Sequence, residues 1–244
     1  MSTPRFHCDA AFTAGTRVRL PDDVFHHATR VRRLRVGDDI VLFAGDGAEA
    51  AARIAVFDRG GADVDILGVA HVDRESPLAI TLVQGISSGE RMDYTLQKAV
   101  ELGASAIVPV FVERSIVRLA GERADKRLAH WREIVASACE QCGRNRIPEV
   151  SAAASFAEAI PRVAAHAALR YVLSVEGGER LRALPAPQSG LALLAGPEGG
   201  LTPGEERAAR AAGFAPISLG PRVLRTETAA VAAMAAMQAL WGDG

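Results

Sequence analysis

A ten-residue segment near the C-terminus carries the side chains best suited to chemistry. Residues 219–228 read LGPRVLRTET, which places two arginines, two threonines and a glutamate between an apolar segment and an alanine-rich one. Two of these residues have a structural explanation: Thr226 would serve as the N-cap of a following helix, and Glu227 would interact favourably with the dipole at that helix N-terminus. Capping does not require Arg222 or Arg225, so these cations indicate ligand binding or stabilisation of an anion, and solvated surface arginines are the alternative.

A second segment, residues 195–203, has the composition of a ligand-compatible turn. It reads AGPEGGLTP and follows an apolar segment typical of a strand. Gly199 and Gly200 allow the backbone to approach a ligand closely. Thr202, with a glutamate three residues later, predicts a capping box, and Pro203 suits the first helical position. The Gly-Lys-Ser/Thr of a phosphate-binding P-loop is absent, and an ordinary strand–helix turn is the alternative.

Both loops fall where strands of an α/β domain are expected to end. Apolar segments alternate with segments of helical spacing, a pattern typical of a mainly parallel sheet. Strands are expected at 78–86, 106–112, 170–175, 190–195 and 216–219, and helices at 92–102, 124–141, 156–168, 203–212 and 227–241. Because ligands bind beyond the carboxyl ends of strands in open α/β sheets, both loops are candidates for a binding site.

The N-terminal segment predicts a small β module instead. Its strands are expected at 37–43, 51–57 and 62–69. An Asp-Gly pair at Asp46 is typical of a β-hairpin turn. The surrounding Gly-x-Gly-x-x-Ala spacing is not a dinucleotide fingerprint, because a strand follows where that fingerprint needs a helix. A polar linker near residue 73 divides the chain into two expected domains, 1–73 and 74–244.

The charge distribution leaves nucleic-acid binding open. The net charge is −1, which argues against gross electrostatic capture of nucleic acid. Seven arginines nevertheless lie in residues 1–35 against three aspartates. This clustering indicates either a basic surface or a solvated charged face.

Neither a metal site nor a membrane segment is predicted. Cys139 and Cys142 form a C-x-x-C pair, but a structural zinc site needs four ligands and no second pair is present. The first residues lack the apolar core of a secretory signal. The longest uncharged stretch, 228–242, is shorter than the roughly 20 apolar residues of a membrane span. We therefore expect a cytoplasmic protein.

Motifs along nearly the whole chain carry a family resemblance. They are His27, Arg30 and Arg33 before 36–38, then 89–92, 97–98, 101–103, 140–141, 143–148, 196–200 and 219–229. Together these motifs resemble the RsmE family of 16S ribosomal RNA uridine-N3 methyltransferases, within the SPOUT or trefoil-knot superfamily. The one departure is Val223, where isoleucine is common.

The resemblance implies a fold, a cofactor and partners. It implies a PUA-like β-barrel that helps to hold RNA, followed by a SPOUT-type trefoil-knot α/β domain. The implied reaction uses S-adenosylmethionine to methylate N3 of a uridine in 16S rRNA of the small ribosomal subunit. Homodimers are implied, with the active site near the subunit interface. Two alternatives are a SPOUT methyltransferase acting on another RNA atom (a ribose 2′-hydroxyl or a guanine nitrogen) and a non-catalytic RNA-binding dimer.

Site residues follow from the loops together with the resemblance. Cofactor contacts are expected from Leu173, Gly196, Glu198, Gly199, Gly200, Leu219, Gly220, Pro221, Arg222, Val223, Leu224 and Thr228. Because uridine N3 carries a proton at neutral pH, Arg225 is expected to stabilise the anion, and Glu227 is the nearest carboxylate that could accept the proton. RNA phosphates are expected to meet Arg5, His27, Arg30, Arg33, Arg144 and Arg146.

Overall fold

A computed structural model describes residues 3–26, 28–29, 32–58, 61–117 and 120–244, and the chain forms two compact units. The first unit comprises Met1–Glu75 with Ala136–Ile147, and the second comprises Ser76–Val135 with Pro148–Gly244. The expected domain 74–244 included residues 136–147, which the structure groups with the N-terminal unit instead. No helix among the described residues is long and apolar enough to cross a membrane.

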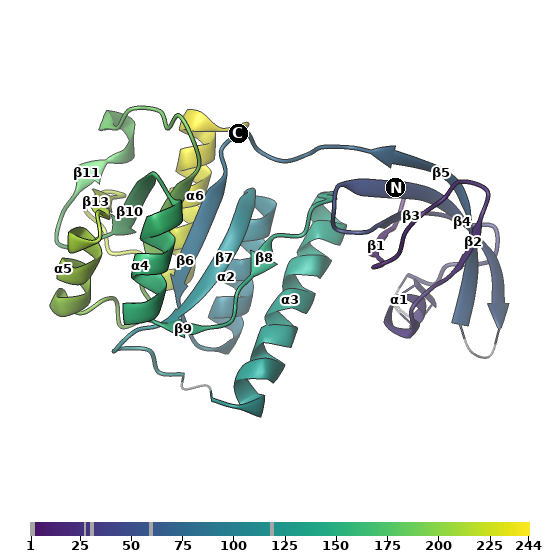
Figure 1. Cartoon of the computed structure of the whole chain (residues 1–244), viewed down its shortest axis with the longest axis horizontal. Coiled ribbons are helices and arrows are strands. Elements are labelled where there is room, and N and C mark those ends of the chain that lie inside the picture. The colour runs from purple at the N-terminus through teal and green to yellow at the C-terminus, as the bar shows by residue number, and fades with distance from the viewer. Residues whose placement is uncertain (1–2, 27, 30–31, 59–60, 118–119) are drawn as a thin grey trace. The chain divides into compact units, whose positions relative to one another are not determined.

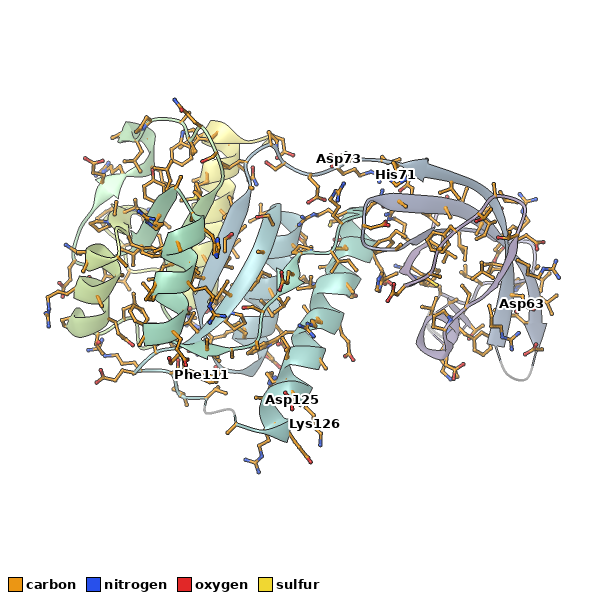
Figure 2. All side chains as sticks on the ribbon, viewed as in Figure 1. Asp63, His71, Asp73, Phe111, Asp125 and Lys126 are labelled. Atoms are coloured by element: carbon orange, nitrogen blue, oxygen red, sulfur yellow. The ribbon has the colours of Figure 1, made fainter. Side chains whose placement is uncertain are left out.

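The first unit contains a five-stranded sheet in the order β1-β3-β4-β5-β2. Its strands are β1 (Arg5–His7), β2 (Arg17–Arg19), β3 (Asp39–Phe43), β4 (Ala48–Asp58) and β5 (Gly61–His71), with helix α1 at Asp22–His26. The hairpin at Asp46 is confirmed, because β3 pairs antiparallel with β4. Alternate residues of β4 (Ala50, Ala52 and Ile54) are buried, so the strand buries one face. Figure 2 shows Asp63 and His71 on β5.

The second unit contains an eight-stranded sheet in which every pairing is parallel. The order is β11-β13-β10-β12-β6-β7-β8, and β9 also pairs with β7. The strands are β6 (Ile80–Gly85), β7 (Ala104–Phe111), β8 (Glu149–Val150), β9 (Ala154–Ser155), β10 (Leu169–Leu173), β11 (Glu179–Arg180), β12 (Leu191–Ala195) and β13 (Ala215–Ser218). The expected mainly parallel sheet is confirmed.

Helices cover both faces of this sheet (Figure 1). They are α2 (Gly89–Glu101), α3 (Glu122–Cys142), α4 (Phe156–His166), α5 (Pro203–Ala211) and α6 (Thr226–Trp241). One buried cluster joins α4 and α5 to the sheet through Ile160, Ala209 and Leu194. Helices α2 and α6 pack against each other. Helix α3 begins in the second unit, where Asp125 and Lys126 lie near its start, and its last residues belong to the first unit (Figure 2).

The strand order brings the loops of the candidate site together. The chain runs from β6 to its neighbour β7, and later returns to the other side of β6 with β12, β10 and β13. Because the strands are parallel, the loops that follow β6, β10, β12 and β13 emerge at one edge. Ligands bind at such an edge, close to the point where the strand order reverses.

Candidate active site

The two predicted loops line one cavity of about 550 Å³ in the second unit. Its walls come from the segments that follow β7, β10, β12 and β13 and from the first turns of α2, α5 and α6. This volume lies within the range of about 300–1,000 Å³ that is typical of small-molecule sites. The cavity is therefore large enough to hold a cofactor.

The predicted cofactor residues gather at this cavity with one exception. Those in its lining are Leu173, Gly196, Glu198, Gly199, Gly200, Leu219, Gly220, Pro221, Arg222, Val223 and Leu224. Arg225 and Glu227 line it as well. Thr228 is exposed and is not part of the lining.

Sequence reasoning missed several lining residues. They include Arg91, Arg114, Ser174, Val175, Glu176 and Glu206. Arg91 lies within residues 89–92, one of the motifs that carry the family resemblance. That motif did not indicate that Arg91 would lie at the cavity. Arg114 and Ser174 carry no local signal, since only the parallel order of the strands brings them to the loops.

Residues 196–202, the glycine loop, pass close to the end of β6. A Cβ at Gly85 would lie 2.5 Å from Pro197 Cδ and 2.8 Å from the Pro197 backbone nitrogen. The loop itself is a tight turn, in which the Gly200 amide donates to the Pro197 carbonyl at 2.8 Å and Gly200 has a φ of +68°. Glycine is thus needed at Gly85 for space and at Gly200 for conformation.

Glu198 is anchored on the N-terminus of α2. Its Oε1 accepts hydrogen bonds from the Ser88 amide at 2.9 Å, the Ser88 hydroxyl at 2.6 Å and Arg91 Nη1 at 3.1 Å. Burial alone would raise the pKa of this carboxyl, but the hydrogen bonds from Ser88 and Arg91 outweigh it and hold the pKa at about 2. The carboxylate therefore stays ionised and fixes the glycine loop.

Arg114 supports the same loop from another direction. Its Nη1 donates to the carbonyls of Gly199 at 3.1 Å and Leu201 at 3.3 Å. A Cβ at Gly199 would lie 2.8 Å from Arg114 Cβ, so the arginine packs directly on the glycine. The loop is consequently held from both α2 and the segment that follows β7.

Thr226 joins the two loops. Helix α6 begins at Thr226, with Arg225 as the N-cap residue and no side-chain cap. The prediction that Thr226 caps the helix is therefore wrong. Its buried hydroxyl donates to the Gly196 carbonyl at 2.7 Å and lies 3.4 Å from Gln84 Nε2. Because the topology brings that carbonyl close, the hydroxyl ties α6 to the glycine loop.

Arg225 and Glu227 differ in their surroundings. Arg225 is exposed and lines the cavity. The Glu227 side chain is 20% exposed, and its Oε2 lies 3.9 Å from Arg91 Nε. Within the described residues this Oε2 is buried and accepts no hydrogen bond. The site thus offers a permanent cation and a carboxylate that both line the cavity.

The predicted RNA-binding arginines fall into three groups. Arg5 pairs with Glu49 at 3.0 Å with a side chain 13% exposed, and the buried Arg144 pairs with Glu75. These two guanidinium groups stabilise the first unit instead of facing solvent. Arg33 and Arg146 are exposed and stay predictions. His27 and Arg30 lie outside the described residues.

The fold and site define a class of protein, as comparison with known families shows. The family model "RNA methyltransferase domain" matches residues 74–238, and the model "RNA methyltransferase PUA domain" matches residues 20–67. The chain is therefore built as an RNA methyltransferase with a PUA-type domain. This agrees with the expected SPOUT-type α/β domain and PUA-like module.

Relatives narrow the class to one family. Ribosomal RNA small subunit methyltransferase E of Mycobacterium bovis is 38% identical, over 96% of this chain and 91% of the relative. That of Bacillus subtilis is 33% identical, over 87% and 86% of the two chains. The chain belongs to the ribosomal RNA small subunit methyltransferase E family, as the resemblance indicated.

Two similar solved structures contain S-adenosylmethionine. The enzyme from Neisseria gonorrhoeae, crystallised bound to S-adenosylmethionine, is 45% identical over 99% of both chains with a TM-score of 0.91. A methyltransferase from Legionella pneumophila, in complex with the same cofactor, is 38% identical over 100% of both chains with a TM-score of 0.94.

Proposed function

We propose that the chain transfers a methyl group from S-adenosylmethionine to N3 of a uridine in 16S rRNA of the small ribosomal subunit. The observation that carries the proposal is the cavity of about 550 Å³ formed by the loops 196–200 and 219–225. Membership of the methyltransferase E family and the cofactor in two full-length structural relatives support it.

The residues present suit the cofactor. The glycine loop offers backbone groups, the absence of a Cβ at Gly199 and Gly200 allows a close approach, and Leu173, Val223 and Leu224 supply apolar walls. When bound, S-adenosylmethionine supplies a methyl group on a sulfonium leaving group. The protein's own contribution is orientation, exclusion of water and electrostatics.

The acceptor requires removal of a proton. Uridine N3 is protonated at neutral pH, and methylation leaves no place for that proton. Glu227, whose side chain lines the cavity, accepts this proton on its carboxylate. Arg225, a permanent cation in the cavity lining, stabilises the negative charge that develops on the uracil oxygens.

Further features of the family complete the proposal. Residues 1–73 bind RNA through exposed cations such as Arg33, and the exposed Arg146 of residues 136–147 adds a further cation. Residues 74–244 form a trefoil knot. The chain acts as a homodimer in the cytoplasm, where small ribosomal subunits are found. Val175 and Val223, 74% and 80% exposed beside the cavity, support a partner surface.

The test is a labelling experiment with product analysis. The protein is incubated with methyl-labelled S-adenosylmethionine and either naked 16S rRNA or small subunits, and nucleosides are analysed by mass spectrometry. We expect N3-methyluridine at one position. A 2′-O-methylated ribose or a methylated guanine would favour the alternative acceptors. If the protein bound RNA but neither bound S-adenosylmethionine nor methylated the RNA, a non-catalytic RNA-binding dimer would be favoured.

A further inference from the structure

Arg91 occupies a position between two carboxylates of the cavity. It lies in the first turn of α2, where Nη1 is 3.1 Å from Glu198 Oε1 and Nε is 3.9 Å from Glu227 Oε2. The three residues come from three elements: α2, the loop that follows β12, and α6. The Arg91 guanidinium therefore connects the glycine loop, through Glu198, with Glu227, the carboxylate proposed as proton acceptor.

The two carboxylates depend on Arg91 to different degrees. Glu198 Oε1 receives two hydrogen bonds from Ser88 besides the one from Arg91, so the glycine loop would keep its anchor without the arginine. For Glu227, the ion pair with Arg91 is the interaction that the structure shows for Oε2, which accepts no hydrogen bond among the described residues. Loss of Arg91 should therefore affect Glu227 far more than the loop.

We propose that Arg91 is a positioning residue for methyl transfer, which holds the Glu227 carboxylate in place while itself anchored on Glu198. This inference rests on the proposed function and deepens it. Arg91 lines the cavity with a side chain that is 43% exposed, and its guanidinium contacts the two carboxylates. Its anchoring is good, since the Glu198 side chain is 17% exposed and keeps its charge. Arg91 thus acts through Glu227.

Arg114 provides a matched control. It also lines the cavity and holds the glycine loop, but it donates its hydrogen bonds to the carbonyls of Gly199 and Leu201, on the loop itself. Arg114→Gln should therefore weaken the loop and cofactor affinity. Arg91→Gln should instead lower the rate of transfer. The two variants separate loop support from positioning of the carboxylate.

The experiment measures single-turnover methylation of small subunits at saturating S-adenosylmethionine, together with calorimetric affinity for the cofactor. We expect Arg91→Gln to slow transfer at least tenfold with an affinity change under about threefold, and Arg91→Lys to recover most of the rate because it keeps the charge. Arg114→Gln should show the reverse pattern, a clear loss of cofactor affinity with little change in the transfer rate at saturating cofactor. Circular dichroism and urea unfolding verify that each variant is folded.

A double-mutant cycle tests whether Arg91 acts through Glu227. Added to Glu227→Gln, the Arg91→Gln change should slow transfer less than twofold further, because the group that it positions is already altered. An equal slowing in both backgrounds, or the same rate–affinity pattern for Arg91→Gln and Arg114→Gln, would overturn the inference. The wild type is assayed in parallel: if it forms no N3-methyluridine, the proposed function fails, whereas an active wild type with an equally fast Arg91→Gln variant refutes only the positioning role.

Discussion

At the scale of single residues, the site depends on where side chains are absent as much as on where they are present. Gly85 ends β6 directly beneath Pro197 of the glycine loop, with no room for a Cβ. Protein interiors are packed too densely to absorb such an overlap without displacement. A methyl group at Gly85 would therefore move the loop that lines the cavity.

Gly85→Ala should lower stability by about 1–3 kcal/mol and weaken S-adenosylmethionine binding at least tenfold. Gly204→Ala is the matched control, because a Cβ at Gly204, in the first turn of α5, would meet Thr202 Oγ1 at an ordinary 3.7 Å. That variant should be neutral or more stable by up to about 1 kcal/mol. Urea unfolding and calorimetric titration provide the measurements, and equal behaviour of the two alanines would contradict this account.

At the scale of elements, helix starts position the catalytic loops. The predicted capping box of α5 is confirmed: the Glu205 amide donates to Thr202 Oγ1 at 3.2 Å and the Thr202 amide donates to the Glu205 carboxylate at 2.8 Å. Helix α4 has the same arrangement with Ser155 and Glu158. The first box ends the glycine loop and is flanked by the lining residues Leu201, Pro203 and Glu206, whereas no residue of α4 lines the cavity.

Thr202→Ala and Ser155→Ala should each cost about 1 kcal/mol of stability, because each removes one N-cap hydrogen bond. Only Thr202→Ala should also weaken S-adenosylmethionine binding, by several-fold, since it loosens the end of residues 196–202. Urea unfolding followed by the fluorescence of Trp131 and Trp241, both in the second unit, reports the stability of both variants. A comparable loss of affinity in Ser155→Ala would show that general destabilisation is responsible.

At the scale of the whole molecule, the chain leaves the second unit to complete the first. Asn145, from residues 136–147, donates to Glu49 Oε2 at 3.0 Å, and Arg5 and Arg74 donate to the same oxygen at 3.0 and 2.9 Å. Burial raises the pKa of the Glu49 carboxyl, but hydrogen bonds from Arg74, Arg5 and Asn145 prevail and hold the pKa at about 2. One carboxylate thus fixes three distant segments.

The lowered pKa of Glu49 makes the stability of the first unit pH-dependent. A carboxyl whose folded pKa is depressed contributes stability above its unfolded value, 4.5, and loses that contribution as pH falls towards 2. Glu49→Gln should cost about 3 kcal/mol at neutral pH, since it removes the carboxylate from the ion pair with Arg5, whose side chains are only 13% and 18% exposed. The substitution should also reduce the loss of stability between pH 4.5 and 2. Acid unfolding and hydrogen exchange in β4 and β5 measure both effects.

Asp39→Asn is the control for this prediction, because Asp39 pairs with Arg53 on the surface and both side chains are more than half exposed. Solvent screens such a pair, so little change in stability is expected. Equal losses of stability in Glu49→Gln and Asp39→Asn would contradict a larger contribution from the hydrogen bonds around Glu49.

The sequence by itself determined the features that depend on residues close together in the chain. Periodicity predicted helices α2–α6 and five strands of the parallel sheet (β6, β7, β10, β12 and β13), but not the two-residue strands β8, β9 and β11. The Asp-Gly turn at Asp46 predicted the β3–β4 hairpin, and the spacing of Thr202 and Glu205 predicted the capping box. Composition also identified both loops of the cavity, because glycines and unexplained arginines stand out against apolar flanks. These features depend on residues a few positions apart, whose interactions are the same in any fold.

The tertiary structure decided which distant groups meet. Only the strand order β10-β12-β6 places Arg91 between Glu198 and Glu227 and gives the Thr226 hydroxyl a carbonyl acceptor in place of a cap. Likewise, Arg144 stands in a basic motif but pairs with Glu75 inside the first unit. A side chain's role depends on its nearest charge or dipole in space, and residues far apart in the sequence supply that neighbour only after the chain has folded.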